Sequence, residues 1–589
     1  MTAFVHPLPF GATLLAPDRT RFRLWAPDRG HVDVEIEGGP TVPMTAAGGG
    51  WFEAEAACGA GTRYRYRLAP DLAVPDPASR AQADDIHGPS IVVDAGAYAW
   101  RHPEWRGRPW RNTILYELHV GTCGGYAGVV QRLPEIAALG ITAIELMPLA
   151  EFPGGRNWGY DGVLPFAPES AYGPPEALKA LIDAAHGLGL MVFLDVVYNH
   201  FGPDGNYLGA YAKPFFRTDL PTPWGAAIDF RVPEVRSYFI ENALYWLQEY
   251  RFDGLRLDAV HAIAERDWLE ELAARVRSTV DPDRLVHLVL ENDHNDADLL
   301  TAGFDAQWND DGHHVLHHML TGEADGYYTD YADRPAERLR RCLAEGFVYQ
   351  GEPSPHRGGT ERGLPSDHLP PTSFVLFLQN HDQIGNRALG ERLTALAPPQ
   401  AMDAGMALLL LAPQIPLLFM GDEWGSRTPF HFFTSHGPDL AQAVRDGRRR
   451  EFAAFAGFAD LVDQLRDPND HATFADSIPD PGEAELAPGS TRADLVRRLL
   501  LLRHCEIIPR LDDTRTEASE VLGATAVVVH WRLGDGSVYA LYVNLGDQPA
   551  AARRRGGEVM VAVPETAAAE LDRGTLPPWS VVAVLGRVA

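Results

Sequence analysis

The sequence predicts an α/β protein, a (β/α)₈ TIM barrel flanked by an N-terminal β-sandwich and a small C-terminal β domain. Three observations lead to this fold class. Eight short apolar runs recur between residues 113 and 420, and most are followed by a segment of helical periodicity. Strand-like alternating segments precede these runs and return after residue 506. A chain of 589 residues also exceeds one ordinary core, which favours several domains.

The N-terminal β-sandwich is predicted over residues 1–105. The segments that alternate in character, as strands with one buried face do, lie at 21–25, 31–37, 51–55 and 63–68. Clusters of Gly, Pro and Asp separate them, as the turns of an antiparallel sheet require. A Pro-rich stretch and a Trp-rich segment follow, and they mark the expected exit from this domain.

The barrel is predicted over residues 106–505. Its apolar runs lie at 113–120, 141–147, 190–197, 252–259, 285–290, 304–308, 373–378 and 415–420. Such runs are typical of parallel strands that helices cover. Segments 175–188 and 233–250 have the helical period, with proline near the first turn. A doubly wound open sheet is the alternative, but no Gly-x-Gly-x-x-Gly motif follows an early strand.

The C-terminal β domain is predicted over residues 506–589. Its expected strands lie at 525–531, 537–543, 558–563 and 580–584. A helix at 492–504 should close the barrel region, after a long excursion rich in Asp, Pro and Gly.

Charge and composition exclude several classes of protein. With 80 acidic and 51 basic residues the net charge is −29, which argues against a nucleic-acid partner. The longest apolar stretch, 407–420, is broken by prolines and too short to span a bilayer, and no secretory signal is apparent. Four scattered cysteines have no CxxC spacing. We therefore expect a cytoplasmic protein with no membrane partner.

Carboxylates gather where four barrel strands are expected to end. These ends have the sequences LDVVYNH at 194–200, GLRLDAVH at 254–261, LENDH at 290–294 and QNHDQ at 379–383. In a (β/α)₈ barrel the active site lies at the C-terminal ends of the strands. A single Asp would be an ordinary helix cap, but four converging carboxylates indicate catalysis.

Several carboxylates at one mouth, without a cofactor motif, favour glycosidic chemistry. This chemistry needs an acid for the departing oxygen and a carboxylate for the oxocarbenium-like carbon. Asp258 is the expected nucleophile, and Arg256, on the same strand face, would favour its ionised form. Glu291 is the expected acid/base, because the apolar run before it would favour its protonated form. Asp382 and His381 are expected to bind sugar hydroxyls.

These strand ends resemble the ordered signature regions of the α-amylase superfamily, glycoside hydrolase family 13. The resemblance implies a retaining mechanism with Asp258 as nucleophile, Glu291 as acid/base and Asp382 as stabiliser of the transition state. It also implies that Tyr160, in WGYD at 158–161, stacks on the sugar being cleaved. One departure is that α-amylases usually have Lys-His three and four residues after the nucleophile. Here His261 stands at the third position and no lysine is present.

Within the superfamily, the chain most resembles the members that release trehalose. The similar stretches lie at 193–207, 254–261, 308–314, 380–386 and 428–433. This resemblance implies hydrolysis of the α-1,4 bond next to the terminal trehalose of a maltooligosyl-trehalose, which a maltooligosyltrehalose synthase would supply. It also implies that the N-terminal sandwich is similar to a carbohydrate-binding module. An α-1,4-glucan branching enzyme, a debranching enzyme and a catalytically silent amylase-like binding subunit remain alternatives.

The substrate contacts expected from these motifs are Tyr160, Asp195, His200, Trp224, Arg256, His261, Asp311, His313, His314, His381 and Gln383. Trp224 is a candidate for stacking on sugar, as are Phe430, Phe432 and Phe433, with core packing as the alternative. The arginines at 448–450 are interpreted as a solvated face.

No cofactor and no metal is expected. Histidines at 313, 314, 317 and 318 could share a helical face, but the HExxH pattern of a zinc protease is missing. Asn199 resembles a calcium ligand of α-amylases, but a calcium site needs several oxygen ligands and the sequence offers no second cluster.

Overall fold

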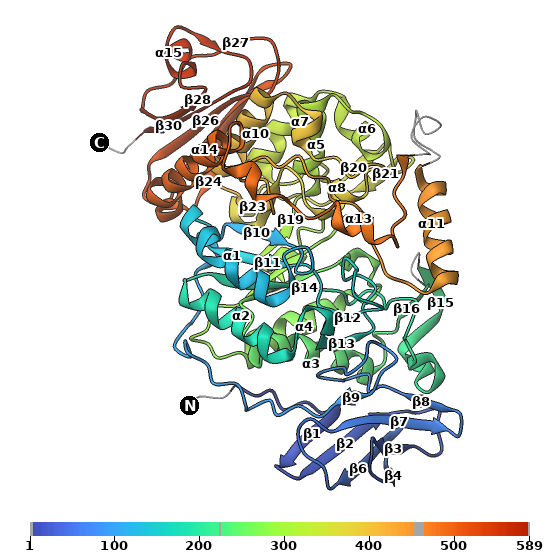
Figure 1. The fold of residues 1–589 in the computed structure, drawn as a ribbon. Coiled ribbons are helices and arrows are strands. Elements are labelled where there is room, and N and C mark those ends of the chain that lie inside the picture. Colours follow the sequence, from blue (N-terminus) through green and yellow to red (C-terminus); the bar gives the residue numbers. More distant parts are fainter. Residues whose placement is uncertain (1–3, 223–224, 453–463, 587–589) are drawn as a thin grey trace.

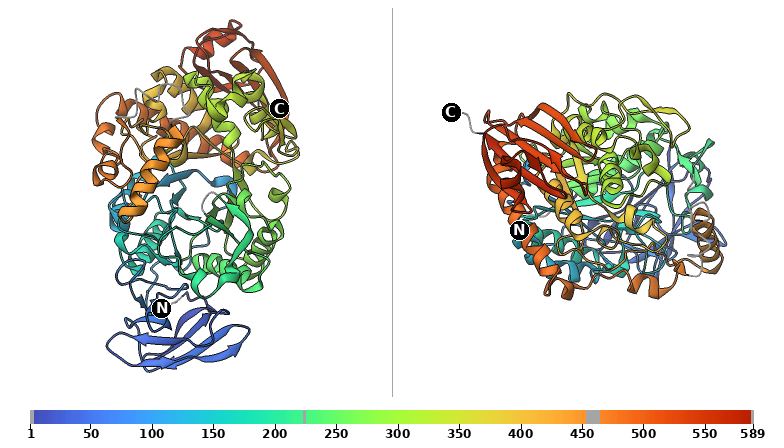
Figure 2. Two further views of the ribbon diagram at one scale, coloured as in Figure 1. Left: turned by 90° about the vertical axis from the view of Figure 1, so that its right-hand side faces the viewer. Right: turned by 90° about the horizontal axis from the view of Figure 1, so that it is seen from above.

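The computed structural model describes residues 4–222, 225–452 and 464–586. Two β-rich parts lie on opposite sides of a central barrel, the N-terminal one in blue and the C-terminal one in red (Figure 1, Figure 2). Eight parallel strands close the barrel, so the predicted fold class is confirmed. Within the described ranges, no helix has both the length and the apolar character that crossing a membrane would require.

Two antiparallel sheets make up the N-terminal part, in the orders β1-β2-β6-β5 and β4-β3-β7-β8 with β9 beside β7. Their strands are β1 (Gly11–Ala16), β2 (Arg19–Trp25), β3 (Asp33–Ile36), β4 (Thr41–Pro43), β5 (Thr45–Gly48), β6 (Trp51–Ala56), β7 (Arg63–Ala69), β8 (Leu72–Val74) and β9 (Ser90–Ile91). Alternate residues of β2 and β7 are buried, and across the sandwich the rings of Phe22 and Tyr64 lie 4.8 Å apart. The four predicted strands are therefore present, and each buries one face.

Each of the eight predicted apolar runs contains one barrel strand. These strands are β10 (Leu115–Leu118), β11 (Ala143–Leu146), β14 (Met191–Val196), β17 (Gly254–Leu257), β18 (His287–Leu290), β19 (Ala306–Trp308), β22 (Phe374–Phe377) and β23 (Ile415–Phe419). Neighbours pair in parallel and in chain order, and β23 returns to β10, where Leu417 lies opposite Leu115.

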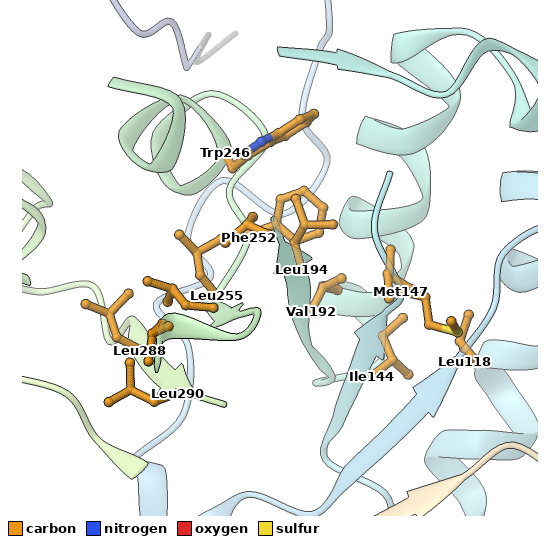
Figure 3. Close-up of a cluster of buried hydrophobic side chains, with 14 of the residues drawn as sticks. Leu118, Ile144, Met147, Val192, Leu194, Trp246, Phe252, Leu255, Leu288 and Leu290 are labelled. Carbon is orange, nitrogen blue, oxygen red and sulfur yellow. The ribbon is translucent and has the colours of Figure 1, made fainter. Parts of the chain in front are cut away.

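Successive residues of these strands face alternately the barrel interior and the surrounding helices. Figure 3 shows part of the buried cluster that outward residues form with neighbouring segments, among them Trp246 of α3 (Pro233–Gln248) and Phe252, which precedes β17. The other labelled residues are Leu118, Ile144, Met147, Val192, Leu194, Leu255, Leu288 and Leu290. A second buried cluster fills the interior and comprises Leu115, Ala143, Met191, Phe193, Val289, Ala306, Trp308, Val375, Phe377, Ile415 and Leu417. Because both faces of each strand are buried, the runs are largely apolar and not alternating.

Helices cover the barrel, but one expected helix is replaced by a turn. The longer helices are α1 (Gly125–Leu139), α2 (Pro175–Gly187), α3 (Pro233–Gln248), α4 (Arg266–Thr279), α5 (Asp310–Thr321), α7 (Pro335–Glu345), α10 (Pro399–Leu411), α11 (Pro438–Phe452) and α14 (Gly489–Leu502). Between β18 and β19 the described chain forms only the short turn Leu299–Thr301, so this unit lacks the helix of a regular (β/α)₈ repeat. There the side chains of Asn292 and Asp296 accept backbone N–H groups two residues ahead, a pattern that competes with helix formation.

Short elements in the barrel loops complete this part. They are the hairpins β12 (Ala150–Glu151) with β13 (Leu164–Pro168), β15 (Phe216–Thr222) with β16 (Gly225–Ile228) and β20 (Glu352–Ser354) with β21 (Thr360–Arg362), and the helices α6 (Thr329–Ala332), α8 (His381–Gly385), α9 (Leu393–Leu396) and α13 (His471–Ala475).

The C-terminal sheet has the order β24-β25-β26-β30-β28. It is formed by β24 (Arg515–Gly523), β25 (Ala526–Arg532), β26 (Val538–Asn544), β28 (Glu558–Val563) and β30 (Ser580–Gly586), with β27 (Ala550–Ala551), β29 (Thr575–Leu576) and α15 (Ala567–Asp572) beside it. The sequence predicted all of the sheet strands except β24, an edge strand of mixed polar and apolar residues that are exposed or half-buried. This sheet packs on α7 and α10 of the barrel. The domain limits at residues 105 and 505 stay predictions.

Candidate active site

A layer of charged side chains lies inside the barrel, one step beyond its apolar filling. Glu117 on β10, Glu145 on β11, Asp195 on β14 and Arg256 on β17 each follow an inward-facing position by two residues. We call these four residues the charged layer. Each is at most 2% exposed. Because they stand toward the C-terminal ends of the strands, they lie directly beneath the loops that build active sites in such barrels.

Arg256 is the centre of this arrangement. Its Nη1 donates hydrogen bonds to Oδ1 and Oδ2 of Asp195, at 2.9 and 2.8 Å, and to Oδ1 of Asp258 at 2.8 Å. Its Nη2 lies 2.9 Å from Oε2 of Glu291. Burial opposes the charge of Arg256, but the carboxylates of Asp195 and Glu291 raise its pKa above the ordinary value. The side chain is fully buried over Trp308, so the expectation that it contacts sugar was wrong and it holds carboxylates instead.

Asp258, the predicted nucleophile, is fixed through both carboxylate oxygens. Oδ1 meets Arg256, and Oδ2 accepts a hydrogen bond from Nδ2 of Asn199 at 2.7 Å. The same amide reaches the backbone oxygen of Asp258 at 2.9 Å. The side chain keeps 12% of its surface exposed, so these contacts hold it in place without burying it completely.

Asn199, considered above as a calcium ligand, thus orients Asp258. Over the described ranges, no group of three or more His, Cys, Asp or Glu side chains is arranged to hold a metal ion.

Glu291, the predicted acid/base, has polar partners that the sequence did not suggest. Besides Arg256, the backbone N–H of Ala259 donates to its Oε2 at 2.7 Å. Ala259 has a φ of 40°, a left-handed conformation that is strained for a residue with a Cβ atom. The apolar run before Glu291 is therefore only one part of its environment. Two donors meet one oxygen and set the direction of this carboxyl group, which is 17% exposed.

Asp382 lies at the start of α8 beside His381. Nδ1 of His381 lies 2.5 Å from Oε1 of Glu117, and its Nε2 lies 2.8 Å from the hydroxyl of Tyr160 and 3.4 Å from Oδ1 of Asp382. Burial alone would lower the pKa of His381, but the carboxylates of Glu117 and Asp382 raise it to about 9. Withdrawal from water raises the pKa of Asp382, an effect that the charge of His381 partly offsets. His381 is therefore an imidazolium at neutral pH.

The charge of His381 leads to a testable pH dependence. Its pKa in the folded protein, about 9, exceeds the ordinary value of 6.5, so the imidazolium stabilises the fold fully below pH 6.5 and this contribution is lost as the pH rises through 9. We expect the free energy of unfolding to fall by about 3 kcal/mol across that window because of this one group. Urea unfolding at a series of pH values measures the fall. In His381→Gln this part of the fall should disappear, and an unchanged pH dependence would contradict the assignment.

Tyr160 contacts Asp195 and His381, and His200 contacts the backbone of Tyr160. The hydroxyl of Tyr160 donates to Oδ2 of Asp195 at 2.6 Å, and its ring lies parallel to His381 with centroids 5.2 Å apart. Nε2 of His200 lies 2.9 Å from the backbone oxygen of Tyr160. Burial raises the pKa of Asp195 to about 7 although Arg256 opposes the shift. The structure thus brings Tyr160, Asp195 and His200 together with the three predicted catalytic carboxylates.

Two expected sugar contacts are instead buried in the protein. Asp311 is completely buried, accepts hydrogen bonds from the N–H groups of Val348 and Tyr349 at 2.7 and 3.0 Å, and pairs with Arg362 at 2.6 Å. His313 is also completely buried, and its Nδ1 lies 2.7 Å from the backbone oxygen of Leu378. Side chains so enclosed cannot reach a sugar. Asp311 instead holds the segment between β19 and β22, and His313 contacts the end of β22.

The other expected contacts differ in their environments. The Oε1 of Gln383 accepts from the N–H of Asn380 at 3.2 Å and so completes the cap of α8. Nδ1 of His261 accepts from the N–H of Asp293 at 3.3 Å, and His261 stays half-buried. His314 is half-buried with its ring 4.5 Å from that of Tyr327. Trp224 lies outside the described residues.

The aromatic residues predicted to stack on sugar, and the arginines predicted to form a solvated face, are more buried than expected. Phe430 and Phe433 are completely buried, so the core alternative holds for both. Phe432 is half-buried, and the guanidinium carbon of Arg448 lies 5.1 Å from its ring centre. Arg448 also donates to the backbone oxygen of Gly385 at 2.9 Å. Arg448 therefore packs on the loop after α8, and only the two arginines that follow it are exposed.

Three acidic residues near the site were not predicted from the sequence. Glu117 and Glu145 each interrupt an otherwise apolar strand, and that interruption is the signal that could have found them. Asp310, the first residue of α5, has its pKa raised by burial and by the negative charges of Glu291 and Asp293. In this motif the sequence had indicated the neighbouring Asp311 as the substrate contact.

Comparison with known proteins finds a matching family model, similar relatives and a similar crystal structure. Residues 91–217 match the family "Alpha amylase, catalytic domain", and residues 514–583 match a domain of unknown function, DUF3459. A malto-oligosyltrehalose trehalohydrolase of Deinococcus radiodurans is 42% identical over 92% of this chain and 90% of its own length. One from Rhizobium sp. (strain M-11) is 37% identical over 95% and 96%. A crystal structure from Salmonella typhimurium, described provisionally as an alpha amylase, has a TM-score of 0.92 and 42% identity over 98% of this chain and 100% of that one.

Proposed function

This chain belongs to the malto-oligosyltrehalose trehalohydrolase family, and from that membership we propose that it hydrolyses the α-1,4 bond next to the terminal trehalose of a maltooligosyl-trehalose. It is a glycoside hydrolase, and the products are trehalose and a shortened maltooligosaccharide. The observation that carries the proposal is the meeting of Asp258 and Glu291 on one buried guanidinium at the C-terminal end of the barrel. This closeness supports the retaining arrangement, in which the two carboxyl groups lie about 5 Å apart.

In the first step, an oxygen of Asp258 attacks the anomeric carbon of the glucose next to trehalose. The bond from that carbon to the trehalose oxygen breaks, and Glu291 gives its proton to the departing oxygen. Arg256 and Asn199 hold Asp258 in position for this attack, so little reorganisation is needed when the bond forms. The maltooligosyl group is then bound covalently to Asp258.

In the second step, water replaces the nucleophile. Glu291, now a carboxylate, takes a proton from water as the water oxygen attacks the same carbon, and the bond to Asp258 breaks. Asp382 stabilises the positive charge that develops on the sugar ring in both steps. The imidazolium of His381, held between Glu117 and Asp382, keeps this carboxylate in place.

A parallel assay tests the proposal. The protein is incubated with maltotriosyl-trehalose, amylose and pullulan, and the products are separated by chromatography. Release of trehalose from the first substrate, with little action on the other two, is the expected result. New α-1,6 branches in amylose would assign the chain to the branching enzymes, and cleavage of pullulan would assign it to the debranching enzymes.

The substrate requires an enzyme that converts the reducing end of a maltooligosaccharide into a trehalose unit, a maltooligosyltrehalose synthase, as a partner in the same pathway. A cytoplasmic location is part of the proposal. All four cysteines, Cys58, Cys123, Cys342 and Cys505, are free thiols, which supports a reducing compartment.

A further inference from the structure

Glu145 stands apart from the other members of the charged layer because nothing holds its carboxyl group. Its side chain is 1% exposed, and among the described residues no backbone or side-chain group donates a hydrogen bond to Oε1 or Oε2. A buried carboxylate in such a position is strongly unfavourable, since it has lost its hydration and gained no donor.

The neighbours of Glu145 on both sides are acidic. Strand β11 lies between β10 and β14. Glu117 is opposite Glu145 in the register, and on β14 Asp195 follows Phe193, the residue opposite Glu145, by two positions. Burial raises the pKa of Glu145, and the charges of Glu117 and Asp195 raise it further, against the smaller effects of Arg256 and His381. Geometry and charge therefore both favour a neutral Glu145.

The nearby cations are already engaged. Arg256 contacts Asp195, Asp258 and Glu291, and His381 contacts Glu117 and Asp382. A protonated carboxyl group, by contrast, has one O–H group to donate, and carboxylate oxygens of Glu117 and Asp195 can accept it. Such a charge-assisted hydrogen bond is among the stronger kinds in proteins.

We propose that Glu145 is a positioning residue for the reaction, a protonated carboxyl group that donates a hydrogen bond within the charged layer to Glu117 or Asp195. Through these two carboxylates it orients His381 and Tyr160, and through His381 it orients Asp382. Glu145 does not touch the substrate. This inference rests on the proposed function for its kinetic consequences, but the protonation of Glu145 does not depend on it.

Two substitutions of similar size separate positioning from packing. Glu145→Gln keeps a neutral donor and should hold kcat for trehalose release within about threefold of the wild type. Glu145→Met removes the donor and should lower kcat by about tenfold to a hundredfold with KM little changed. If Glu145 has only a structural role, Glu145→Met should keep the wild-type kcat. Replacing a buried, unpaired polar group by an apolar one is neutral or stabilising for the fold. Wild-type kcat in Glu145→Met, or an equal loss in both variants, would overturn the proposal.

Infrared difference spectroscopy provides a measurement that needs neither substrate nor the methionine variant. The carbonyl-stretch band of a protonated carboxyl group should be present in the wild type at neutral pH and missing in Glu145→Gln. If no such band is lost, Glu145 is ionised and the proposal fails, whatever reaction the protein catalyses. Failure of the wild type to release trehalose would instead reject the proposed function.

Discussion

Asp258→Asn is expected to abolish nearly all trehalose release, with kcat lowered on the order of 10⁴-fold or more. An amide is a poor nucleophile and cannot form the glycosyl-enzyme bond. The fold should survive, because Asn has almost the same volume and Arg256 keeps its contacts with Asp195 and Glu291. Initial rates on maltotriosyl-trehalose measure the loss, and circular dichroism with thermal unfolding measures the fold.

The matched control for this substitution is Asp283→Asn. Asp283 is exposed in the loop before β18, at the other end of the barrel from the site. Its kcat should equal that of the wild type. Near-normal turnover in Asp258→Asn would reject Asp258 as the nucleophile, and an unfolded protein would show that its contact with Arg256 is needed for stability.

Glu291→Gln is expected to lower kcat by about 10²- to 10⁴-fold on maltotriosyl-trehalose. The amide cannot give a proton to the departing trehalose, although Gln can still accept the hydrogen bond from Ala259 that positions the side chain. A glycoside with a good leaving group needs little protonation. With such a substrate, the first step of the variant should therefore be much less impaired, as a burst of leaving group in stopped-flow measurements will show.

Glu135→Gln serves as the control for the acid/base. Glu135 is exposed on α1, one of the helices that cover the outside of the barrel. The Glu135→Gln substitution should leave the rates on both substrates at the wild-type values. If Glu291→Gln slows the first step equally for good and poor leaving groups, Glu291 is not the acid.

Much of the fold was predictable because it depends on local patterns. Each of the eight apolar runs contains a barrel strand, since a strand buried on both faces is largely apolar along its length. Strand β24 was missed because an edge strand with exposed polar residues carries no such pattern. The turn at Leu299–Thr301 was missed because Asn and Asp side chains, and not Gly or Pro, interrupt the helix there.

The site was predictable only in part. Asp258, Glu291 and Asp382 follow strands, so their positions in the chain already place them at one end of a barrel. Asp311 and His313 stand just as near a strand end, yet the fold buries both. Position relative to a strand therefore finds the end of the barrel, but it does not decide which side chains stay exposed there.

The sequence by itself determined the order of strands, the end of the barrel where carboxylates gather, and the chemistry that these carboxylates can perform. Which of these side chains contact one another depends on the tertiary structure. Glu117 meets His381 across 264 residues, and Asn199 meets Asp258 across 59. The physical reason is that ion pairs and hydrogen bonds act over a few ångströms, and the strands approach to that distance only once the barrel has closed and excluded water.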